Sequence, residues 1–210
     1  MEIRLLPLKV WVRMGIWAVV LHTIGALLID FIMWKSGVVY EVMAGQLLLL
    51  AGGVWLLIVL FVILVRLRRS GYLDPLRIIL WSIGVSVSSA PLKALGEKGI
   101  EPLLQAEYEA YPLQRARALR AYFQAQSESG RAHLSPEKQE EIIQMQTQLY
   151  LAYRERQQHL GSVIMDRLKV LGILGTVYGL ILGLLLRGGG SVELPAKALQ
   201  AKSEGNAASS

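Results

Sequence analysis

The sequence contains no cysteine in 210 residues. This absence excludes disulfide bonds, thiolate metal sites, thiol nucleophiles and lipid-modified cysteines. Histidine is scarce, and neither His133 nor His159 has a cluster of histidine or carboxylate near it at ligand spacing. There is also no phosphate-binding loop or nucleophile elbow. Glu137, Glu140 and Glu141 are most simply the solvated face of a helix, so the sequence predicts a non-enzyme without metal or cofactor.

Charged residues make up only 18% of the chain, whereas 53% is hydrophobic and the mean hydropathy is +0.42. This balance is typical of an integral membrane protein. Residues 43–65 contain no charge and reach about 34 Å as a helix, which is enough to cross a bilayer. Residues 14–34 and 170–186 are the other two long apolar segments. The predicted fold is therefore all-α, with three transmembrane helices in a lipid bilayer.

The net charge of +6 comes from basic residues that flank the apolar segments. Between segments two and three, acidic residues nearly balance basic ones, so nucleic acid is not an expected partner. By the positive-inside rule, both basic flanks are cytoplasmic. These flanking residues are Arg4, Lys9 and Arg13 before the first segment, and Arg66, Arg68 and Arg69 after the second.

The apolar stretch Ile78 to Ala90 is too short and too rich in serine to be predicted as a span. Pro91, Pro102 and Pro112 are expected to divide the chain after it into short pieces. The predicted order is a cytoplasmic N-terminus (1–13), transmembrane helix 1 (14–34), an external loop (35–42), transmembrane helix 2 (43–65), a cytoplasmic helical region (66–169), transmembrane helix 3 (170–186) and a flexible external tail (187–210).

A new helix is expected to begin at Pro136, because Ser135 is a favourable N-cap and Glu137 lies near the positive end of the helix dipole. No proline follows before the third span, so one helix is predicted from Pro136 to Leu186, about 76 Å long. Its apolar stripe requires a neighbour. That neighbour is either residues 113–126 in a helical hairpin or another copy in an oligomer.

Four glycines form a stripe along the third span: Gly172, Gly175, Gly179 and Gly183. In lipid, such a stripe lets another helix backbone approach closely, so these residues are predicted at a helix contact, either ordinary packing or an assembly surface. Thr176 lies between them. Its hydroxyl either bonds back to the carbonyl of Gly172 or lines a narrow hydrated path, and the spacing alone favours the first.

The run Leu171 to Leu180, LGILGTVYGL, resembles the signature of the penultimate helix in the MotA/TolQ/ExbB proton channel family, which reads much like LGLLGTVWGL. The approach from Pro136 to Lys169 and the two preceding spans resemble the flagellar-stator layout. The resemblance implies a homo-oligomeric ring in the bacterial inner membrane. The ring would enclose a single-span partner subunit with a membrane aspartate, and Thr176 would line the pore.

Members of this family continue with a final span, which residues 187–210 do not provide. The chain is therefore interpreted as a divergent or truncated member. Two functions remain open: a subunit of a proton-motive-force-driven energiser or stator, and a non-conducting helical scaffold.

His22 and Asp30 are ionisable residues within the first span, where such groups are uncommon and should face protein or water. They are eight residues apart, about 12 Å along one helix, so they are not a direct pair. His22 is either a packed histidine or, less favoured, part of a proton relay. Asp30 is expected to be hydrated near the outer end.

Overall fold

The computed structural model describes residues 6–41, 44–71, 73–129 and 134–186. In this part of the chain every regular element is helical. The elements are α1 (Leu8–Lys35), α2 (Val38–Glu41), α3 (Ala44–Arg68), α4 (Pro75–Ile100), the 3₁₀ helix η1 (Glu101–Leu104), α5 (Gln105–Glu128), α6 (Pro136–Gln158) and α7 (Leu160–Leu185). The all-α prediction is confirmed. The predicted tail 187–210 lies outside the described residues.

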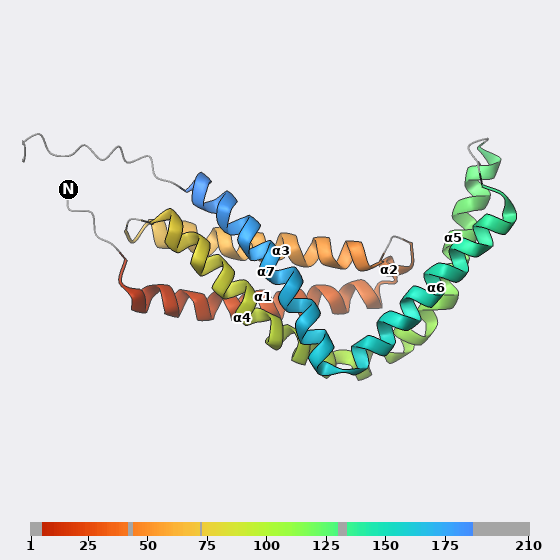
Figure 1. Ribbon diagram of the computed structural model, residues 1–210, viewed down its shortest axis with the longest axis horizontal. Helices are drawn as coiled ribbons and strands as arrows, with labels where there is room; N and C mark the ends of the chain where they lie inside the picture. The colour runs from red at the N-terminus through yellow and green to blue at the C-terminus, as the bar shows by residue number, and fades with distance from the viewer. Residues whose placement is uncertain (1–5, 42–43, 72, 130–133, 187–210) are drawn as a thin grey trace, which may run out of the picture.

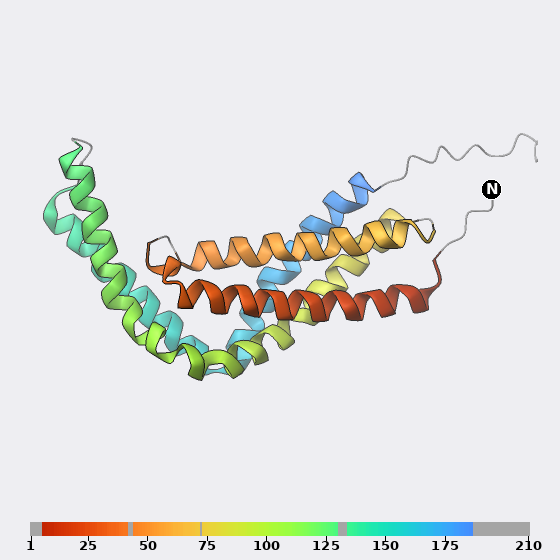
Figure 2. The ribbon, with the colours of Figure 1, turned by 180° about the vertical axis from the view of Figure 1, so that it is seen from behind.

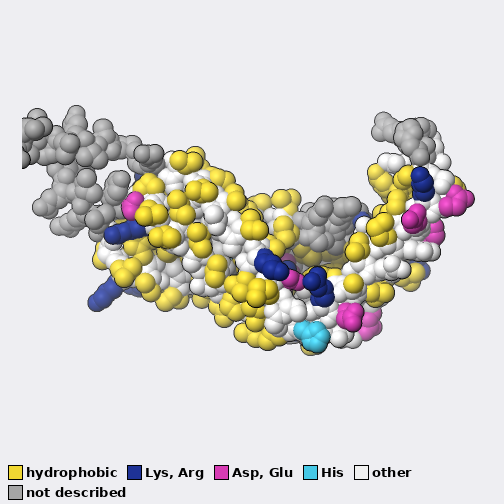
Figure 3. All heavy atoms as spheres, in the orientation of Figure 1, with side chains coloured by type: hydrophobic (Ala, Val, Ile, Leu, Met, Phe, Trp, Pro, Cys, Tyr) yellow, Lys and Arg dark blue, Asp and Glu magenta, His cyan; other side chains and the backbone are white. Residues whose placement is uncertain are grey.

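The long helices α1, α3, α4 and α7 form a body in which α1 lies beside α3 and α4 lies beside α7 (Figures 1 and 2). Each contains a segment long and apolar enough to cross a membrane. Hydrophobic side chains cover much of the face of this body seen in Figure 3, and many large apolar side chains of the four helices are exposed. Exposed apolar surface on this scale is typical of lipid contact. The chain is therefore a multi-pass membrane protein with four candidate spans rather than three.

The fourth candidate span is α4, which begins at Pro75 and continues through Pro91 to Ile100. Asp74 caps its start by accepting a hydrogen bond from the Leu76 amide at 3.3 Å, and Pro75 occupies the first turn. The helix has 26 residues, or about 39 Å at 1.5 Å per residue. The prediction that this segment is too short to cross was wrong, because the helix continues well beyond Ala90. Proline is tolerated inside membrane helices when neighbouring helices pack around it.

Helices α5 and α6 form a hairpin that extends away from the body at an angle (Figures 1 and 2). The start of α6 is confirmed: the Ser135 hydroxyl accepts from the Lys138 amide at 3.4 Å, and Pro136 is the first helical residue. The packing of α5 against α6 agrees with the alternative of an intramolecular hairpin. Pro112 lies inside α5 and does not end it.

The predicted continuous helix from Pro136 to Leu186 is not present, because the chain bends at His159, whose φ of −93° and ψ of 108° are extended. The physical reason lies in the partner helices. Helix α6 follows α5 and α7 follows α4, and the α4–α5 path itself bends at η1, where Pro102 lies. The α6–α7 path must therefore bend opposite η1 so that α6 stays on α5 and α7 stays on α4.

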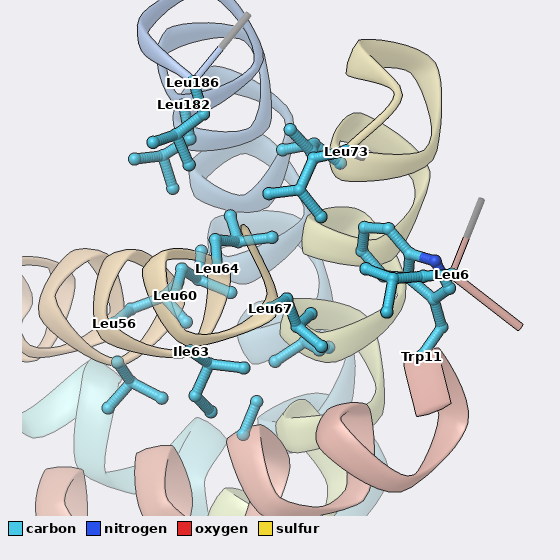
Figure 4. Close-up of a cluster of buried hydrophobic side chains, with 14 of the residues drawn as sticks. Leu6, Trp11, Leu56, Leu60, Ile63, Leu64, Leu67, Leu73, Leu182 and Leu186 are labelled. Atoms are coloured by element: carbon cyan, nitrogen blue, oxygen red, sulfur yellow. The ribbon is translucent and has the colours of Figure 1, made fainter. Parts of the chain in front are cut away.

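One end of the body brings together the start of α1, the end of α3, the start of α4 and the end of α7. Leu6, Leu67, Leu73 and Leu186 belong to one buried cluster there, and Figure 4 shows them converging. The Arg77 guanidinium donates to the Leu6 carbonyl at 3.4 Å. We call this the basic end, because Arg13, Arg66, Arg68, Arg69 and Arg77 lie on the helix segments that meet at it. The opposite end carries the hairpin.

Four crossings change the expected sides of the membrane. If the basic end is cytoplasmic, as the positive-inside rule requires, α4 leaves the cytoplasm and α7 returns to it. The hairpin would then be external, opposite to the side derived from three spans. We expect a reporter inserted between Ser129 and Ser135 to be active only outside the cytoplasm, and one fused after Leu186 to be active only inside. A hairpin reporter active in the cytoplasm would contradict this orientation.

Candidate functional site

Four charged side chains from three of the candidate spans meet near the hairpin end of the body. The Lys93 ammonium of α4 lies 3.2 Å from an Asp30 carboxylate oxygen of α1 and 3.7 Å from Glu97. The Arg167 guanidinium of α7 lies 3.1 Å from Glu97. Their side chains are between 12% and 21% exposed, and acid alternates with base. We refer to Asp30, Lys93, Glu97 and Arg167 as the charge chain.

Asp30 was expected to be hydrated near the outer end, and its hydration stays a prediction. Its side chain is buried, paired with Lys93, and lies in the lining of the cavity described below. An ionised carboxylate is costly to bury without a partner, so the pairing accounts for its position. The other three members were missed at the sequence level. Lys93 and Glu97 follow Pro91, where the helix was expected to break, and Arg167 precedes the predicted third span.

A second ionic group joins the body to the hairpin. Glu101 of η1 accepts from Lys98 at 2.9 Å and from Arg154 of α6 at 2.7 Å. The Arg154 guanidinium also lies over the Tyr108 ring, 4.2 Å from its centre. These contacts combine a carboxylate pair with a cation–π interaction. They hold the C-terminal end of α6 against η1 and the end of α4.

Aromatic side chains reinforce the same junction. The Tyr150 hydroxyl of α6 donates to the Tyr108 carbonyl of α5 at 2.9 Å. Burial raises the pKa of Tyr150 above its ordinary value, so this hydroxyl keeps its proton. Trp34 of α1 packs edge-on against Tyr108 and Tyr111, with ring centres 4.7 and 5.4 Å away. The hairpin is therefore held to α1 as well as to α4.

Between these groups lies a cavity of about 430 Å³. It reaches from Gln146 and Arg154 on the hairpin to His22 of α1 and Leu174 of α7. His22 is 1% exposed, and neither of its ring nitrogens has a hydrogen-bond partner in the described structure. The sequence placed His22 and Asp30 on neighbouring faces of one helix, and both line this cavity. The charge chain lines it too, so the site brings ionisable groups into the interior of the candidate spans.

Three glycines of the predicted stripe face α4. A β-carbon at Gly179 would lie 3.0 Å from the Ile79 Cα atom, and one at Gly175 would lie 2.5 Å from the Ser86 hydroxyl oxygen. Gly183 approaches the Pro75 carbonyl in the same way, at 3.5 Å. Gly172 has open space at this position. The contact formed by this stripe is thus within the chain, between α7 and α4.

Thr176 lies on a different face of α7. Its side chain is exposed, and its hydroxyl donates to the Gly172 carbonyl at 2.8 Å. This is the back-bond that the spacing favoured. Ile173, Val177 and Leu180 share its exposed surface. In the described chain, the hydroxyl therefore contacts neither α4 nor the cavity.

Within the described ranges, no three histidine or acidic side chains are grouped so that they could hold a metal ion. The arrangement instead offers paired ionic groups, an unpartnered imidazole and an exposed hydroxyl. Comparisons of the chain with protein-family models, curated proteins and solved structures give no match.

Proposed function

We propose that the protein is a subunit of a membrane complex driven by the proton motive force, in the class that the α7 motif resembles. The observation that carries the proposal is that α7 presents two different faces. Its glycines are buried against α4, whereas Thr176 remains on the exposed face. The helix is thus held in place by one side and presents its hydroxyl on another, where a neighbouring helix can reach it.

The proposed role of Thr176 is to accept a hydrogen bond. Its proton is directed to the Gly172 carbonyl at 2.8 Å, which leaves the lone pairs of the hydroxyl oxygen for a donor from outside. Water or a protonated carboxylic acid is such a donor. A partner helix with a membrane aspartate would supply this acid in its neutral state, and would lose the contact when the acid ionises.

Two carboxylates of this chain's own candidate spans do not compete for that role. Asp30 and Glu97 are engaged with Lys93 and Arg167, on the side of the cavity. The proton-carrying carboxylate is therefore assigned to a single-span partner. Copies of this chain would form a ring around it in a bacterial inner membrane. Only the role of the α7 motif is taken from the resemblance to the family. The reporter experiment determines on which side of the membrane the hairpin lies.

A second candidate function, a non-conducting helical scaffold, also has a specific observation in its favour. The Thr176 hydroxyl has a partner within its own helix, and Gly175, Gly179 and Gly183 are occupied by α4. With these contacts, the hydroxyl and the glycine face of α7 are satisfied within the chain and require no partner protein. The two candidates therefore differ in what the exposed oxygen of Thr176 does.

Replacing Thr176 with valine separates the two functions. Valine keeps the shape but lacks the oxygen, and leaving a partner without its hydrogen bond costs about 1 to 3 kcal/mol. We expect partner-dependent proton flux into vesicles to fall roughly tenfold, which corresponds to about 1.4 kcal/mol. Thr176→Ser keeps the hydroxyl and should retain most of the flux. Unchanged flux for the valine variant at equal abundance would favour the scaffold, as would no flux from the parent protein with its partner.

A further inference from the structure

The cavity has an open end at the hairpin. Leu49 of α3 and Leu149 of α6 both line it and are 49% and 59% exposed, so its mouth lies between these two helices. Gln146 and Arg154 line the same region and supply polar atoms. Most of the lining is apolar, but a roomy cavity that reaches the surface can hold water beside the charged and amide groups in its wall.

The inner end of the cavity lies near the middle of the candidate spans. His22 is the fifteenth of the 28 residues of α1, about 20 Å from Lys35 along the helix axis. Leu174 is the fifteenth of the 26 residues of α7. Gly53 of α3 lines the cavity between them. The polar path therefore passes the charge chain and reaches roughly half the thickness of the bilayer.

Beyond His22 the α1 and α3 side of the interior is closed by hydrocarbon, whereas the buried Ser82 and Ser86 of α4 face α7. Ala18 lies one turn further along α1 and is fully buried. Leu56, Leu60 and Leu64 follow at one-turn spacing on α3, each fully buried, and they lie in the cluster that contains Leu182 (Figure 4). We call these residues the apolar plug. None of the lining residues of the cavity belongs to the plug.

The position of His22 at this boundary calls for a partner that the protein does not supply. A buried polar group without a hydrogen bond costs about 1 to 3 kcal/mol. Both ring nitrogens of His22 lack a protein partner, although the residue lines a cavity with room for water. The ring nitrogens are covered by neighbouring side chains, so a small movement of these side chains is needed for water from the cavity to supply the missing hydrogen bond. Imidazole is the side chain whose ordinary pKa lies closest to neutral pH.

We propose that the cavity is a water-filled half-channel, open on the hairpin side and closed by the apolar plug, through which His22 exchanges protons with solvent. The step is a simple proton transfer. Water donates a proton to a ring nitrogen of the neutral imidazole, and the imidazolium returns it to the same side. The inference is independent of Thr176 and its partner, because the path lies on the other side of α7.

Charged groups line the cavity together with His22. Lys93 of α4 is one of them, and Asp30 of α1 pairs with it at 3.2 Å. Glu97 of α4 and Arg167 of α7 form the next pair of the charge chain. The described part of α3 contributes only uncharged residues to the lining. The two acids and two bases of the charge chain therefore add no net charge beside His22.

The absence of native cysteine makes thiol labelling a direct test of water access. We expect His22→Cys and Gly52→Cys, in sealed vesicles, to react with a membrane-impermeant cationic methanethiosulfonate from the hairpin side only. A β-carbon at Gly52 meets only the Lys93 ammonium, at 3.7 Å, so this variant keeps the fold even where His22→Cys does not. Ser129→Cys, at the exposed hairpin tip, identifies the side, and Ala18→Cys is the matched control in the plug.

We expect reaction rates for the two cavity variants at least tenfold above that of Ala18→Cys. If Ser129→Cys reacts while neither cavity variant does, the cavity is dry and the proposal fails. Equal rates at Ala18 and Gly52 would show that the plug does not close the path. Either result concerns this cavity alone and leaves the proton flux that depends on Thr176 unaffected.

Proton exchange is tested separately on the native imidazole. In a His133→Gln, His159→Gln background, His22 is the one remaining histidine. We expect its ¹⁵N ring signals, in vesicles with different pH on the two sides, to follow the pH on the side where Ser129→Cys reacts. Signals that follow the opposite side, or do not change over pH 4 to 8, would overturn the assignment of His22 as the proton acceptor.

Discussion

Alanine in place of Gly179 is expected to lower the midpoint of thermal unfolding in detergent by several degrees. The added β-carbon would lie 3.0 Å from the Ile79 Cα atom and 3.2 Å from its carbonyl oxygen. Both atoms belong to the backbone of α4, so the two helices must separate along their whole contact. Overpacking of this kind typically costs about 1 to 3 kcal/mol. Gly179→Leu should prevent the native packing of α4 on α7 altogether.

Gly172→Ala is the matched control for this prediction. It lies on the same helix, two turns before Gly179, and has no neighbouring atom near the new β-carbon. Alanine gains up to about 1 kcal/mol of helix propensity at either position, so the comparison isolates the contact. We expect the control to melt at or above the parent temperature. Equal midpoints for the two variants would show that α7 is not packed on α4 through this face.

Breaking the charge chain is expected to have the second large effect. Asp30→Asn leaves the Lys93 ammonium without its nearer carboxylate, and Lys93→Met leaves Asp30 unpaired. Loss of one partner from a fully buried pair costs about 3 to 5 kcal/mol. In Asp30→Asn, Glu97 remains 3.7 Å from Lys93 and offsets part of this cost. We expect each single variant to lower the free energy of unfolding by this order, and the double variant to lose much less than the sum.

The exposed pair of Arg120 and Glu140 provides the comparison. Its guanidinium lies 3.1 Å from the carboxylate, but the side chains are 57% and 46% exposed. Exposed pairs contribute about 0 to 1 kcal/mol, so Arg120→Ala should be nearly silent. Chemical unfolding followed by tryptophan fluorescence would measure all four variants. Strict additivity of Asp30→Asn and Lys93→Met would show that the two groups do not interact across α1 and α4.

Local signals in the sequence determined which segments form helices and where one of them begins. The three predicted apolar segments coincide closely with parts of α1, α3 and α7, and the Ser135 cap starts α6 at Pro136. The glycine spacing predicted a face for close packing, and three of its four members meet α4. Hydrophobicity, capping and small-residue periodicity act within a few turns, so they can be recognised from neighbouring residues.

The tertiary structure decided the features that depend on partners distant in the sequence. Pro91 and the serines around it favoured a break, but α4 continues through Pro91 while it packs against both α7 and α1. The pairing of α7 with α4 bends the chain at His159, where no proline lies and Gly161 alone is a local signal for a turn. Asp30 is neutralised by Lys93, 63 positions later in the chain. The contact of α1 with α4 brings the two together and so offsets the cost of burying the carboxylate. Packing between helices therefore outweighed local preference wherever a buried group required a partner.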